Sequence, residues 1–414
     1  MTPASIPPAT PRSLDGVRVL DLTRVLAGPY CAQNLADLGA EVIKVERPRS
    51  PGHDGGDDTR AWGPPYVKDD DGNDTDVSTY YVSANRGKKS IALDIASDEG
   101  QRTVRALAMI SDVVIENYKV GQLAKYGLDY ASLSRDKPSL IYCSITGFGQ
   151  TGPWAKRPGY DFVVQGLSGF MSLTGEREGA CPTCDGGPPQ KAGIAISDLL
   201  TGIYASGAIC AALLHARRTG QGQQIDMSLL DVMVATIANM NTLYLNSDRI
   251  PGRAGNAHQS IVPYQVFACA DGHLILAVGN DIQWRRFCDV AGCPGLASDP
   301  RFATNPSRVA HRDVLVPMIE TILMGRDKHA WIAAFEAADV PCGPIDNIAE
   351  VFENPQVIAR GLRIDLPHAT AGHVALVANP MRMSATPPRY ELPPPLLDEH
   401  REEILALLDP PVRS

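Results

Sequence analysis

The chain has 414 residues, of which 44% are hydrophobic, and its formal net charge at pH 7 is -9. This length exceeds one ordinary domain and the apolar content is enough to bury substantial cores, so two domains or an elaborated α/β unit are expected. The negative charge argues against nucleic acid or an anionic membrane surface as a partner, so a bound anion must be held by a few well-placed Lys and Arg side chains.

The N-terminal residues and the cysteines both favour a cytoplasmic protein. Residues 1–13 contain several prolines and no continuous apolar core, which predicts a loose tail rather than a signal or transit peptide. The nine cysteines are scattered without a regular framework, as is typical of a reducing compartment. Residues 199–214 carry no charge but stop short of a bilayer span, so they predict a buried helix and no membrane partner is expected.

Strands alternate with helices through the first 150 residues. The run 17–23 predicts a strand, 28–40 a helix that stops at a glycine, and 41–48 a second strand. This alternation predicts an α/β fold with a Rossmann-like parallel sheet covered by helices on both faces. The pattern continues with strands at 89–95, 112–118 and 140–149 and a helix over about 97–110, whereas residues 49–77 are predicted to be a long loop.

The later part of the chain predicts a second, smaller α+β domain. A helix that begins near Asp198 leads into a turn, a short strand and another long helix, after which the pattern changes. Residues 260–279 indicate a hairpin with ADG as its turn. The predicted organisation is a tail at 1–13, a large domain at 14–249, a small domain at 250–355 with helices near 282–292 and 311–338, and a segment at 356–414 that returns to the large domain.

Short nucleotide and metal motifs are weak in this sequence. Residues 147–152 read GFGQTG after a predicted strand, but Pro153 follows at once and the helix that a dinucleotide site requires is not predicted. Cys181 and Cys184 form a C-x-x-C pair without a second pair at metal spacing, and the histidines lack ligand spacing. We therefore expect neither a nicotinamide or flavin site nor a bound metal.

Basic residues lie near several strand ends. Arg47 closes the second strand, Lys88 opens the third, and Lys125 follows the fourth. In an open parallel sheet such residues could gather at the carboxyl-edge crevice, where ligands bind. Ordinary solvated cations explain the pattern equally well, and both alternatives stay open on the sequence alone.

A lone carboxylate stands in the segment GIAISDLLTG, residues 193–202. Asp198 comes after a short apolar run and just before the uncharged stretch. Aspartate is common at helix starts because its side chain caps free amides, so Asp198 is either such a cap or a reactive group.

Longer segments resemble the class III CoA-transferases, the family of formyl-CoA, carnitine and dicarboxylate CoA-transferases. The resemblance runs from about Leu14 to Leu408, and within the family it favours members acting between succinyl-CoA and glutarate. The segments include LDGVRVLDLTRVLAGPYCAQNLADLGAEVIKVERP, SANRGKKSIALDI, DVVIENYKVGQLAKYGLDY, IYCSITGFGQTGPWAKRPGYDFVVQGLSGFMSLTG, GGDDTRAWGPPYV and PPLLDEHREEILALL.

The resemblance implies a role for each of seven residues, and three further residues are candidates because they stand in loops expected to face the site. Asp198 matches the family's nucleophilic aspartate. The resemblance also implies an interlocked, ring-like homodimer and coenzyme A thioesters as substrates, with no tightly bound cofactor. The implied CoA-binding residues are Arg47, Lys88, Asn117 and Lys125, Trp62 and Tyr160 line the acyl site, and Arg24, Arg60 and His258 are candidates for the distal carboxylate of a dicarboxylic acid.

The implied reaction is reversible transfer of CoA from a donor such as succinyl-CoA to a dicarboxylic acid such as glutarate. An ionised Asp198 would form a mixed anhydride and then an aspartyl-CoA thioester. Mesaconate, itaconate, citramalate and oxalate or formate remain alternative acids. An α-methylacyl-CoA racemase is less favoured because Tyr160 stands where that enzyme has a histidine, and a non-catalytic CoA-binding protein is the least favoured alternative.

Overall fold

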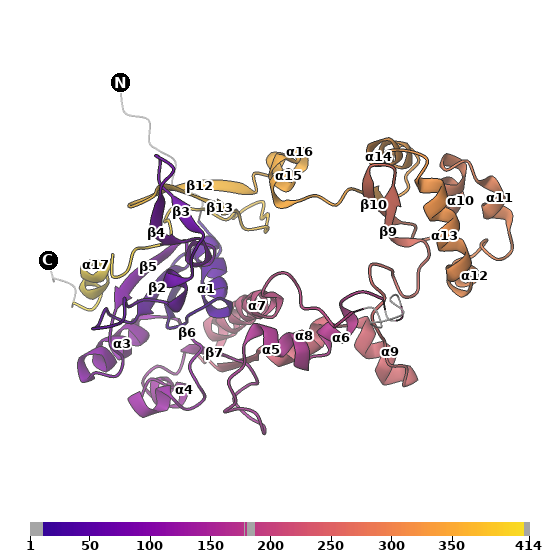
Figure 1. Cartoon of the computed structure of the whole chain (residues 1–414). Helices are drawn as coiled ribbons and strands as arrows, with labels where there is room; N and C mark the ends of the chain where they lie inside the picture. The colour runs from indigo at the N-terminus through magenta and orange to yellow at the C-terminus, as the bar shows by residue number, and fades with distance from the viewer. Residues whose placement is uncertain (1–10, 178, 180–186, 410–414) are drawn as a thin grey trace. The chain divides into compact units, whose positions relative to one another are not determined.

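The computed structural model describes residues 11–177, 179 and 187–409, which form two compact units (Figure 1). The first unit comprises Met1–Phe170, Ala192–Thr242 and Gln356–Ser414, and the second comprises Met171–Lys191 and Leu243–Pro355. The sequence prediction assigned residues 171–191 to the large domain, whereas the structure assigns them to the second unit. The chain therefore passes from one unit to the other four times.

A six-stranded parallel sheet is the centre of the first unit. Its order is β5-β2-β1-β6-β7-β8, and every neighbouring pair is parallel. Numbered by their order along the chain, these six strands run 3-2-1-4-5-6, which is the Rossmann order. The strands are β1 (Arg18–Asp21), β2 (Glu41–Glu46), β5 (Lys88–Ala92), β6 (Val113–Glu116), β7 (Ile141–Thr146) and β8 (Gln224–Ser228).

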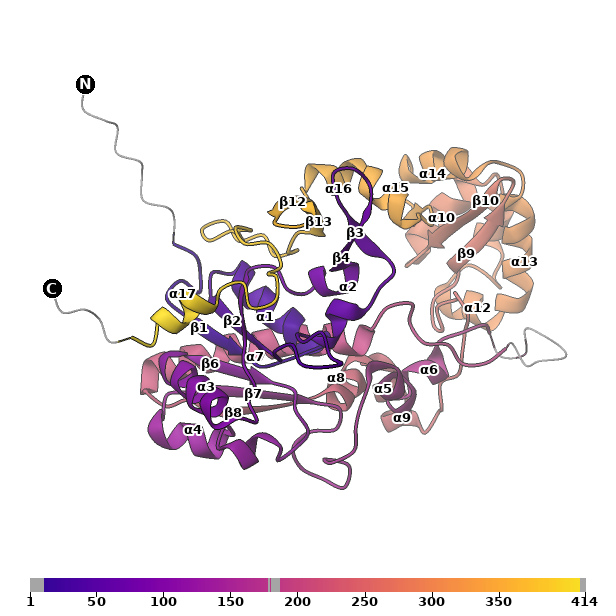
Figure 2. The same ribbon diagram turned by 60° about the vertical axis from the view of Figure 1, so that its left-hand side comes forward.

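Helices cover both faces of this sheet (Figure 2). Successive strand residues point to opposite faces, so Val19 packs in one core and Leu20 in the other. The Val19 core includes helices α1 (Ala27–Asp37), α7 (Ile196–Thr219) and α8 (Leu229–Thr236); the Leu20 core includes α3 (Asp98–Ile110), α4 (Tyr130–Asp136) and α17 (Arg401–Ala406). The predicted parallel sheet with helices on both faces is confirmed.

The strand order fixes where a ligand can bind. The order reverses between β1 and β6. The strands β2 and β5 extend the sheet on the β1 side, and β7 and β8 extend it on the β6 side. In open α/β sheets the crevice outside the carboxyl ends of the strands at this switch point is the binding position. The segments that follow β1 and β6 therefore border the expected binding crevice.

Residues 49–77 are not the long loop that the sequence predicts. They contain the short 3-10 helix η1 (Asp58–Ala61) and the hairpin of β3 (Tyr66–Lys68) with β4 (Asp74–Ser78), followed by α2 (Thr79–Val82). A second hairpin, β12 (Arg363–His368) with β13 (Gly372–Val377), shares an apolar core with this region. The alternation within these strands is short and interrupted by Asp and Gly, which explains why the sequence pattern missed them.

The C-terminal segment lies along the edge strand β5. The His400 N–H donates to the Ser90 carbonyl at 3.0 Å, and the Asp398 carboxylate accepts the Ala92 N–H at 2.7 Å. Ile404 is fully buried in the core that also contains Leu20. The segment at 356–414 thus belongs to the first unit, as the sequence predicts. Its residues near Asp398 and His400 cover the edge of β5, which would otherwise be open.

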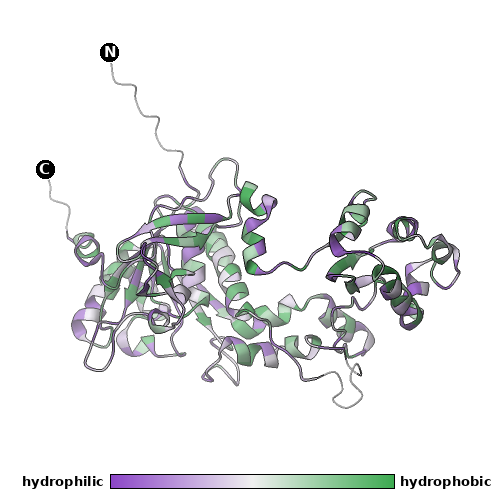
Figure 3. Cartoon of the chain, turned by 45° about the horizontal axis from the view of Figure 1, so that its top comes forward, coloured by the Kyte–Doolittle hydropathy of each residue, from purple (hydrophilic) through white to green (hydrophobic). Residues whose placement is uncertain are grey.

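Helix α7 packs closely on α1. A side chain at Gly202 would meet the Ala27 carbonyl oxygen at 2.7 Å, so glycine lets the two backbones approach. In the described part of the chain, α7 is the one helix long and apolar enough to cross a membrane. The prediction of a buried helix holds for one side only, because Ile203, Tyr204 and Leu214 are exposed; Figure 3 shows apolar positions in green on the strands and on the helices beside them.

The second unit has its own apolar core, built on a small antiparallel sheet. The predicted hairpin is present as β9 (Tyr264–Cys269) and β10 (Gly272–Ala277), with β11 (Cys342–Gly343) beside β10. The single helix predicted near 311–338 is two helices. The described helices of this unit are α6 (Phe170–Leu173, whose first residue belongs to the first unit), α9 (Asn239–Ser247, whose first residues belong to the first unit), α10 (Asp281–Val290), α11 (Pro294–Ser298), α12 (Asn305–Ala310), α13 (Arg312–Leu323), α14 (Lys328–Glu336) and α15 (Ile348–Glu353).

The long helix predicted after β8 is also divided in two. Helix α8 ends at Thr236 and α9 begins at Asn239, because Ala238 between them has a positive φ of 47°. The remaining short elements are η2 (Leu123–Tyr126), α5 (Asp161–Leu167) and α16 (Pro355–Ala359). Cys181 and Cys184 lie outside the described residues.

Candidate functional site

Asp198 occupies the first turn of α7, and a second carboxylate caps that helix. The N-cap residue is Ala195, which provides no side-chain hydrogen bond. Instead the Asp161 carboxylate, from the start of α5, accepts the Ser197 N–H at 2.8 Å and the Asp198 N–H at 3.4 Å. The alternative that Asp198 caps its own helix is therefore wrong, and its carboxylate is left available for chemistry.

The surroundings of Asp198 raise its pKa. Burial disfavours the charged form, and the neighbouring Asp161 carboxylate adds like-charge repulsion, which together raise the pKa of Asp198 to about 7. Within residues 11–177, 179 and 187–409, no hydrogen bond or ion pair to the Asp198 carboxylate is found. Burial and like-charge repulsion thus oppose the helix dipole, which favours the charged form of Asp198.

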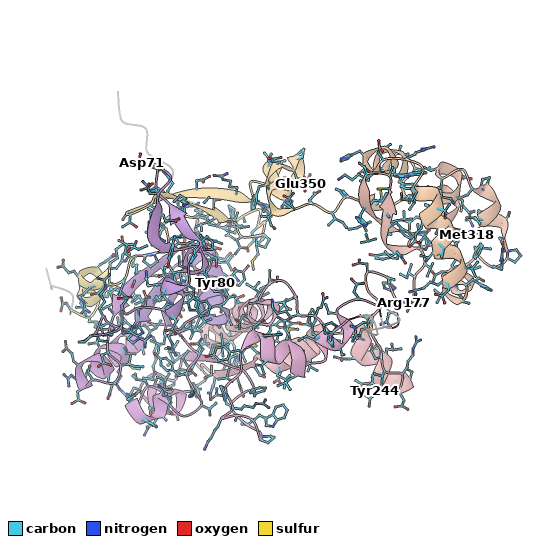
Figure 4. All side chains as sticks on the ribbon, in the orientation of Figure 1. Asp71, Tyr80, Arg177, Tyr244, Met318 and Glu350 are labelled. Atoms are coloured by element: carbon cyan, nitrogen blue, oxygen red, sulfur yellow. The ribbon has the colours of Figure 1, made fainter. Side chains whose placement is uncertain are left out.

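An aromatic pair stands near this carboxyl group. Tyr80, from α2, packs edge-on against Trp62 with ring centroids 5.0 Å apart (Figure 4 labels Tyr80). Burial raises the pKa of Tyr80 to about 12, with the charge of Asp198 as the next cause, which places the phenol in the electrostatic range of Asp198. Tyr80 is a site residue that the sequence reasoning missed, because a tyrosine in an undistinguished run carries no spacing signal.

The two predicted acyl-site aromatic residues are both exposed. Trp62 has 45% of its surface accessible and Tyr160 has 69%, which are high values for large aromatic side chains. Tyr160 directly precedes Asp161 and is the N-cap residue of α5. Trp62 packs on Tyr80 and Tyr160 precedes Asp161, and both Tyr80 and Asp161 interact electrostatically with Asp198. The exposed rings of Trp62 and Tyr160 offer apolar surface to an acyl chain.

A separate cavity of about 240 Å³ lies at the carboxyl ends of β2 and β5 and beside the segment that follows β6. Arg24 follows β1, Arg47 follows β2, and Tyr118 follows β6, so the switch point predicted by the strand order carries two guanidinium groups and an aromatic ring. This composition suits a nucleotide with phosphate groups, since arginine binds phosphate in a fork and stacks on rings.

Asn117 and Lys125 differ in how they relate to this cavity. Asn117 accepts the Arg24 N–H at 3.1 Å and donates to the Arg24 carbonyl at 2.7 Å, so it fixes the backbone of Arg24. Lys125 lies exposed in η2, in the segment between the cavity residues Gln122 and Tyr126. The structure thus joins Asn117 to the cavity as a positioning residue and leaves the Lys125 charge in solvent beside it.

Lys88 does not reach a ligand, which corrects its predicted role. Its side chain is fully buried and its ammonium group donates to Asp21 at 3.0 Å, to the Pro29 carbonyl at 2.9 Å and to Asn85 at 2.9 Å. An ammonium group has three N–H donors, so none remains for a phosphate. Lys88 opens β5 opposite Val42, at the end of the sheet away from the carboxyl edge.

Arg60 is likewise committed to a structural network. It donates to both carboxylate oxygens of Glu46, at 2.8 and 2.7 Å, and to the Tyr81 hydroxyl and the Pro395 carbonyl. Its guanidinium also lies 3.9 Å from the Tyr81 ring centroid. The predicted role of Arg60 in binding a distal carboxylate is therefore corrected, because its charge is already neutralised by Glu46.

The other two candidates for the distal carboxylate are placed differently. Arg24 shares the Asp58 carboxylate with Arg47 and lines the same small cavity, so its setting is that of a phosphate-binding residue. His258 belongs to the second unit, where its ring packs on Tyr264 with centroids 5.3 Å apart and accepts the Ser260 N–H. Its role stays a prediction.

Comparisons with known proteins decide the family. The model of CoA-transferase family III matches residues 14–401. The chain belongs to CoA-transferase family III. It is 53% identical over 396 residues to the succinate–glutarate CoA-transferase of Agrobacterium fabrum, covering 96% of each chain, and 43% identical to the succinyl-CoA:glutarate CoA-transferase of Mus musculus, covering 95% of this chain and 86% of that one.

A solved structure shows the same fold within this family. A CAIB/BAIF family protein from Brucella suis superimposes with a TM-score of 0.83 at 45% identity, covering 96% of this chain and all of that one. CoA-transferases use CoA thioesters as substrates, and the two arginines that line the small cavity suit the phosphate groups of such a substrate. Among the described residues of this family member, no group of three or more His, Cys, Asp or Glu could hold a metal ion.

Proposed function

We propose that the protein transfers CoA from succinyl-CoA to glutarate, and reversibly in the other direction, through Asp198. The observation that carries the proposal is the half-buried Asp198 carboxyl group, without a partner among the described residues, at the start of α7. The proposal is supported by the names of relatives 53% and 43% identical to this chain. An exchange between two carboxylic acids is nearly thermoneutral, so it needs a relay for the acyl group rather than ATP or a redox cofactor.

The first half-reaction separates succinate from CoA in two steps. An Asp198 carboxylate oxygen attacks the thioester carbonyl carbon, the C–S bond breaks, and CoA leaves as the thiolate, which gives a mixed anhydride. The thiolate then attacks the aspartyl carbonyl carbon, the anhydride C–O bond breaks, and succinate leaves from an aspartyl-CoA thioester. Glutarate repeats these steps in reverse order and restores the Asp198 carboxylate.

The neighbours of Asp198 supply positioning and charge control. Asp161 fixes the first turn of α7 through the Ser197 amide, and its charge raises the pKa of the nucleophile. The Tyr80 hydroxyl is protonated at neutral pH, as in any tyrosine, and burial with the nearby carboxylates raises its pKa further, to about 12. It is therefore available to donate a hydrogen bond to an oxygen that gains charge in the reaction.

The proposal includes a cytoplasmic homodimer of interlocked subunits, as the family resemblance implies. Large apolar side chains are exposed on adjoining helices of the first unit, on α5, α7 and α8. Exposed apolar surface of this kind marks an interaction site. The exposed residues are Phe162, Val163, Leu167, Ile203, Tyr204 and Val234. Sedimentation is expected to give twice the 44.4 kDa chain mass, and a monomer at assay concentration would contradict the homodimer.

The acceptor is tested by direct assay. Purified protein with succinyl-CoA and glutarate is expected to form glutaryl-CoA and succinate in equal amounts, measured by liquid chromatography. Mesaconate, itaconate, citramalate, oxalate and formate serve as competing acceptors. A higher kcat/KM for any of these than for glutarate would overturn the glutarate assignment while leaving CoA transfer itself intact.

The raised pKa of Asp198 predicts a pH dependence. The nucleophile must be deprotonated, so kcat/KM is expected to rise with pH through about 7. Replacing Asp161 by asparagine removes the like charge and lowers the pKa of Asp198, so the rising limb moves to lower pH. The measurement is a pH profile of kcat/KM for wild type and Asp161→Asn.

A second buried acid requires a control in this experiment. Burial raises the pKa of Glu116, at the end of β6, to about 7 as well. Its carboxylate accepts the Tyr118 N–H at 2.8 Å rather than any bond from α7. A limb that stays in place in Asp161→Asn and moves in Glu116→Gln would assign the pH dependence to Glu116 instead.

A further inference from the structure

Asp58 holds two arginine side chains at the edge of the small cavity. Its Oδ1 lies 2.9 Å from Arg47 Nη2, and its Oδ2 lies 3.3 Å from Arg24 Nη1. One carboxylate thus faces two guanidinium groups, which leaves one positive charge uncompensated in this trio. All three side chains are about 40% exposed, so ions and ligands from solvent can compete for them.

The contact with Arg24 is incomplete. Only one Arg24 nitrogen faces Asp58, at the long end of the hydrogen-bond range, and Arg24 Nε is buried without a partner among the described residues. A buried donor without an acceptor costs free energy. A phosphate group offers more acceptor oxygens than a carboxylate, so it could satisfy both guanidinium groups more fully than Asp58 does.

The backbone beneath Asp58 is fixed, so its side chain alone can move. Asp57 accepts the Val25 N–H at 3.1 Å and the Thr59 N–H at 3.0 Å, and it pairs with the buried Lys44 ammonium at 2.9 Å. The position of Asp58 is therefore set by its neighbour. Release of the two arginines requires only rotation of the Asp58 side chain.

A second cavity offers room for the Asp58 carboxylate after it leaves the two arginines. Asp58 lines a second cavity of the first unit, of about 1130 Å³, whereas Arg24 and Arg47 line the cavity of about 240 Å³. Asp57, the residue directly before Asp58, lines both cavities. Asp58 thus reaches from the larger cavity to the arginines of the smaller one.

We propose that Asp58 is a built-in competitor of the phosphate groups of the CoA substrate: it occupies Arg24 and Arg47 in the empty protein and is displaced when the nucleotide end of CoA binds. The inference rests on the proposed function for the identity of the ligand. It assigns Arg24 to the phosphate end of the substrate rather than to the distal carboxylate of the acid. It also makes Asp58 a residue that sets affinity and does not touch the reacting atoms.

The test compares Asp58→Asn with a matched charge variant. Asp54→Asn makes the same charge change in the same loop, and Asp54 forms no ion pair within the described residues. The probe is adenosine 3′,5′-bisphosphate, the nucleotide end of CoA, measured by isothermal titration calorimetry. Asp58→Asn is expected to bind it about three- to tenfold more tightly than wild type and Asp54→Asn to match wild type, since exposed pairs of this kind are weak.

Salt and a double variant sharpen the result. The advantage of Asp58→Asn is expected to shrink at high ionic strength, because exposed charges are screened. The affinity gained by Asp58→Asn is also expected to be smaller in an Arg47→Ala background, because one of the two guanidinium groups for which Asp58 and phosphate compete is removed. Equal advantages with and without Arg47 would show that Asp58 acts through general charge and would overturn the inference.

The outcomes separate this inference from the proposed function. Equal affinity of wild type and Asp58→Asn for the probe, or no binding by either, overturns the role of Asp58 whether or not the protein transfers CoA. Tighter binding by Asp58→Asn in a protein that forms no glutaryl-CoA supports the competitor role of Asp58 and overturns the proposed transfer of CoA to glutarate.

Discussion

Replacing Asp198 by alanine is expected to abolish CoA transfer while leaving CoA binding in place. Loss of the nucleophile removes the covalent route entirely, and such losses in enzymes that use a covalent nucleophile reach about 10⁴-fold or more in kcat. Asp198 has no hydrogen-bond or ion-pair partner for its carboxylate among the described residues, so the substitution leaves no buried group unpaired. The fold is therefore expected to survive.

The covalent intermediate itself is the sharper measurement. Protein incubated with succinyl-CoA and then hydroxylamine is expected to carry a hydroxamate on the peptide that contains Asp198, detected by mass spectrometry. Asp198→Ala treated in the same way is the control for non-specific modification. Normal turnover in Asp198→Ala, or an unmodified Asp198 peptide in an active enzyme, would assign the chemistry to another group.

The second large effect is expected at Lys88, and it is an effect on stability. Lys88→Ala leaves the fully buried Asp21 without its ion-pair partner, and breaking a buried pair on one side costs about 3–5 kcal/mol. The measurement is the temperature of half-inactivation together with the yield of soluble protein. A role in CoA binding alone would instead raise the KM for succinyl-CoA in a stable protein.

Lys89 provides the matched control for this prediction. It is the next residue along the same strand, and its ammonium group pairs at the surface with Glu41 at 2.8 Å and Glu403 at 2.7 Å. Partly exposed pairs contribute about 0–1 kcal/mol, so Lys89→Ala is expected to remain near wild type. A similar loss of stability in both variants would contradict the special position of Lys88.

The fold was predictable from the sequence because its signals are local. Short β-branched runs such as 17–23 and 41–48 alternate with helical stretches, and this alternation requires a covered parallel sheet. The hairpin of β3 and β4 was not predicted, because only a few of its residues alternate between apolar and polar. The assignment of residues 171–191 to the second unit escaped because units joined by several crossings leave no mark in composition.

The site was predictable only in part, because the spacing of residues along the sequence does not show where a side chain points or whether it is buried. Lys88 and Arg60 look like free cations in sequence, yet each is surrounded by acceptors that lie elsewhere in the chain. Asp161 and Tyr80 belong beside Asp198 and carry no motif of their own. Asp198 itself was found through resemblance, and its raised pKa follows from neighbours that only the fold brings together.

The C-terminal cover of β5 has a consequence for biosynthesis. Until Asp398 and His400 have been synthesised, the backbone groups of Ser90 and Ala92 have no partner on that side, and the core around Leu20 lacks Ile404. A nascent chain therefore presents an open strand edge and an incomplete core throughout the translation of the residues between Ala92 and Asp398. An open edge of this kind can pair with the strand of another chain. The unit in which catalysis is proposed is therefore closed by residues made long after the strands that they cover.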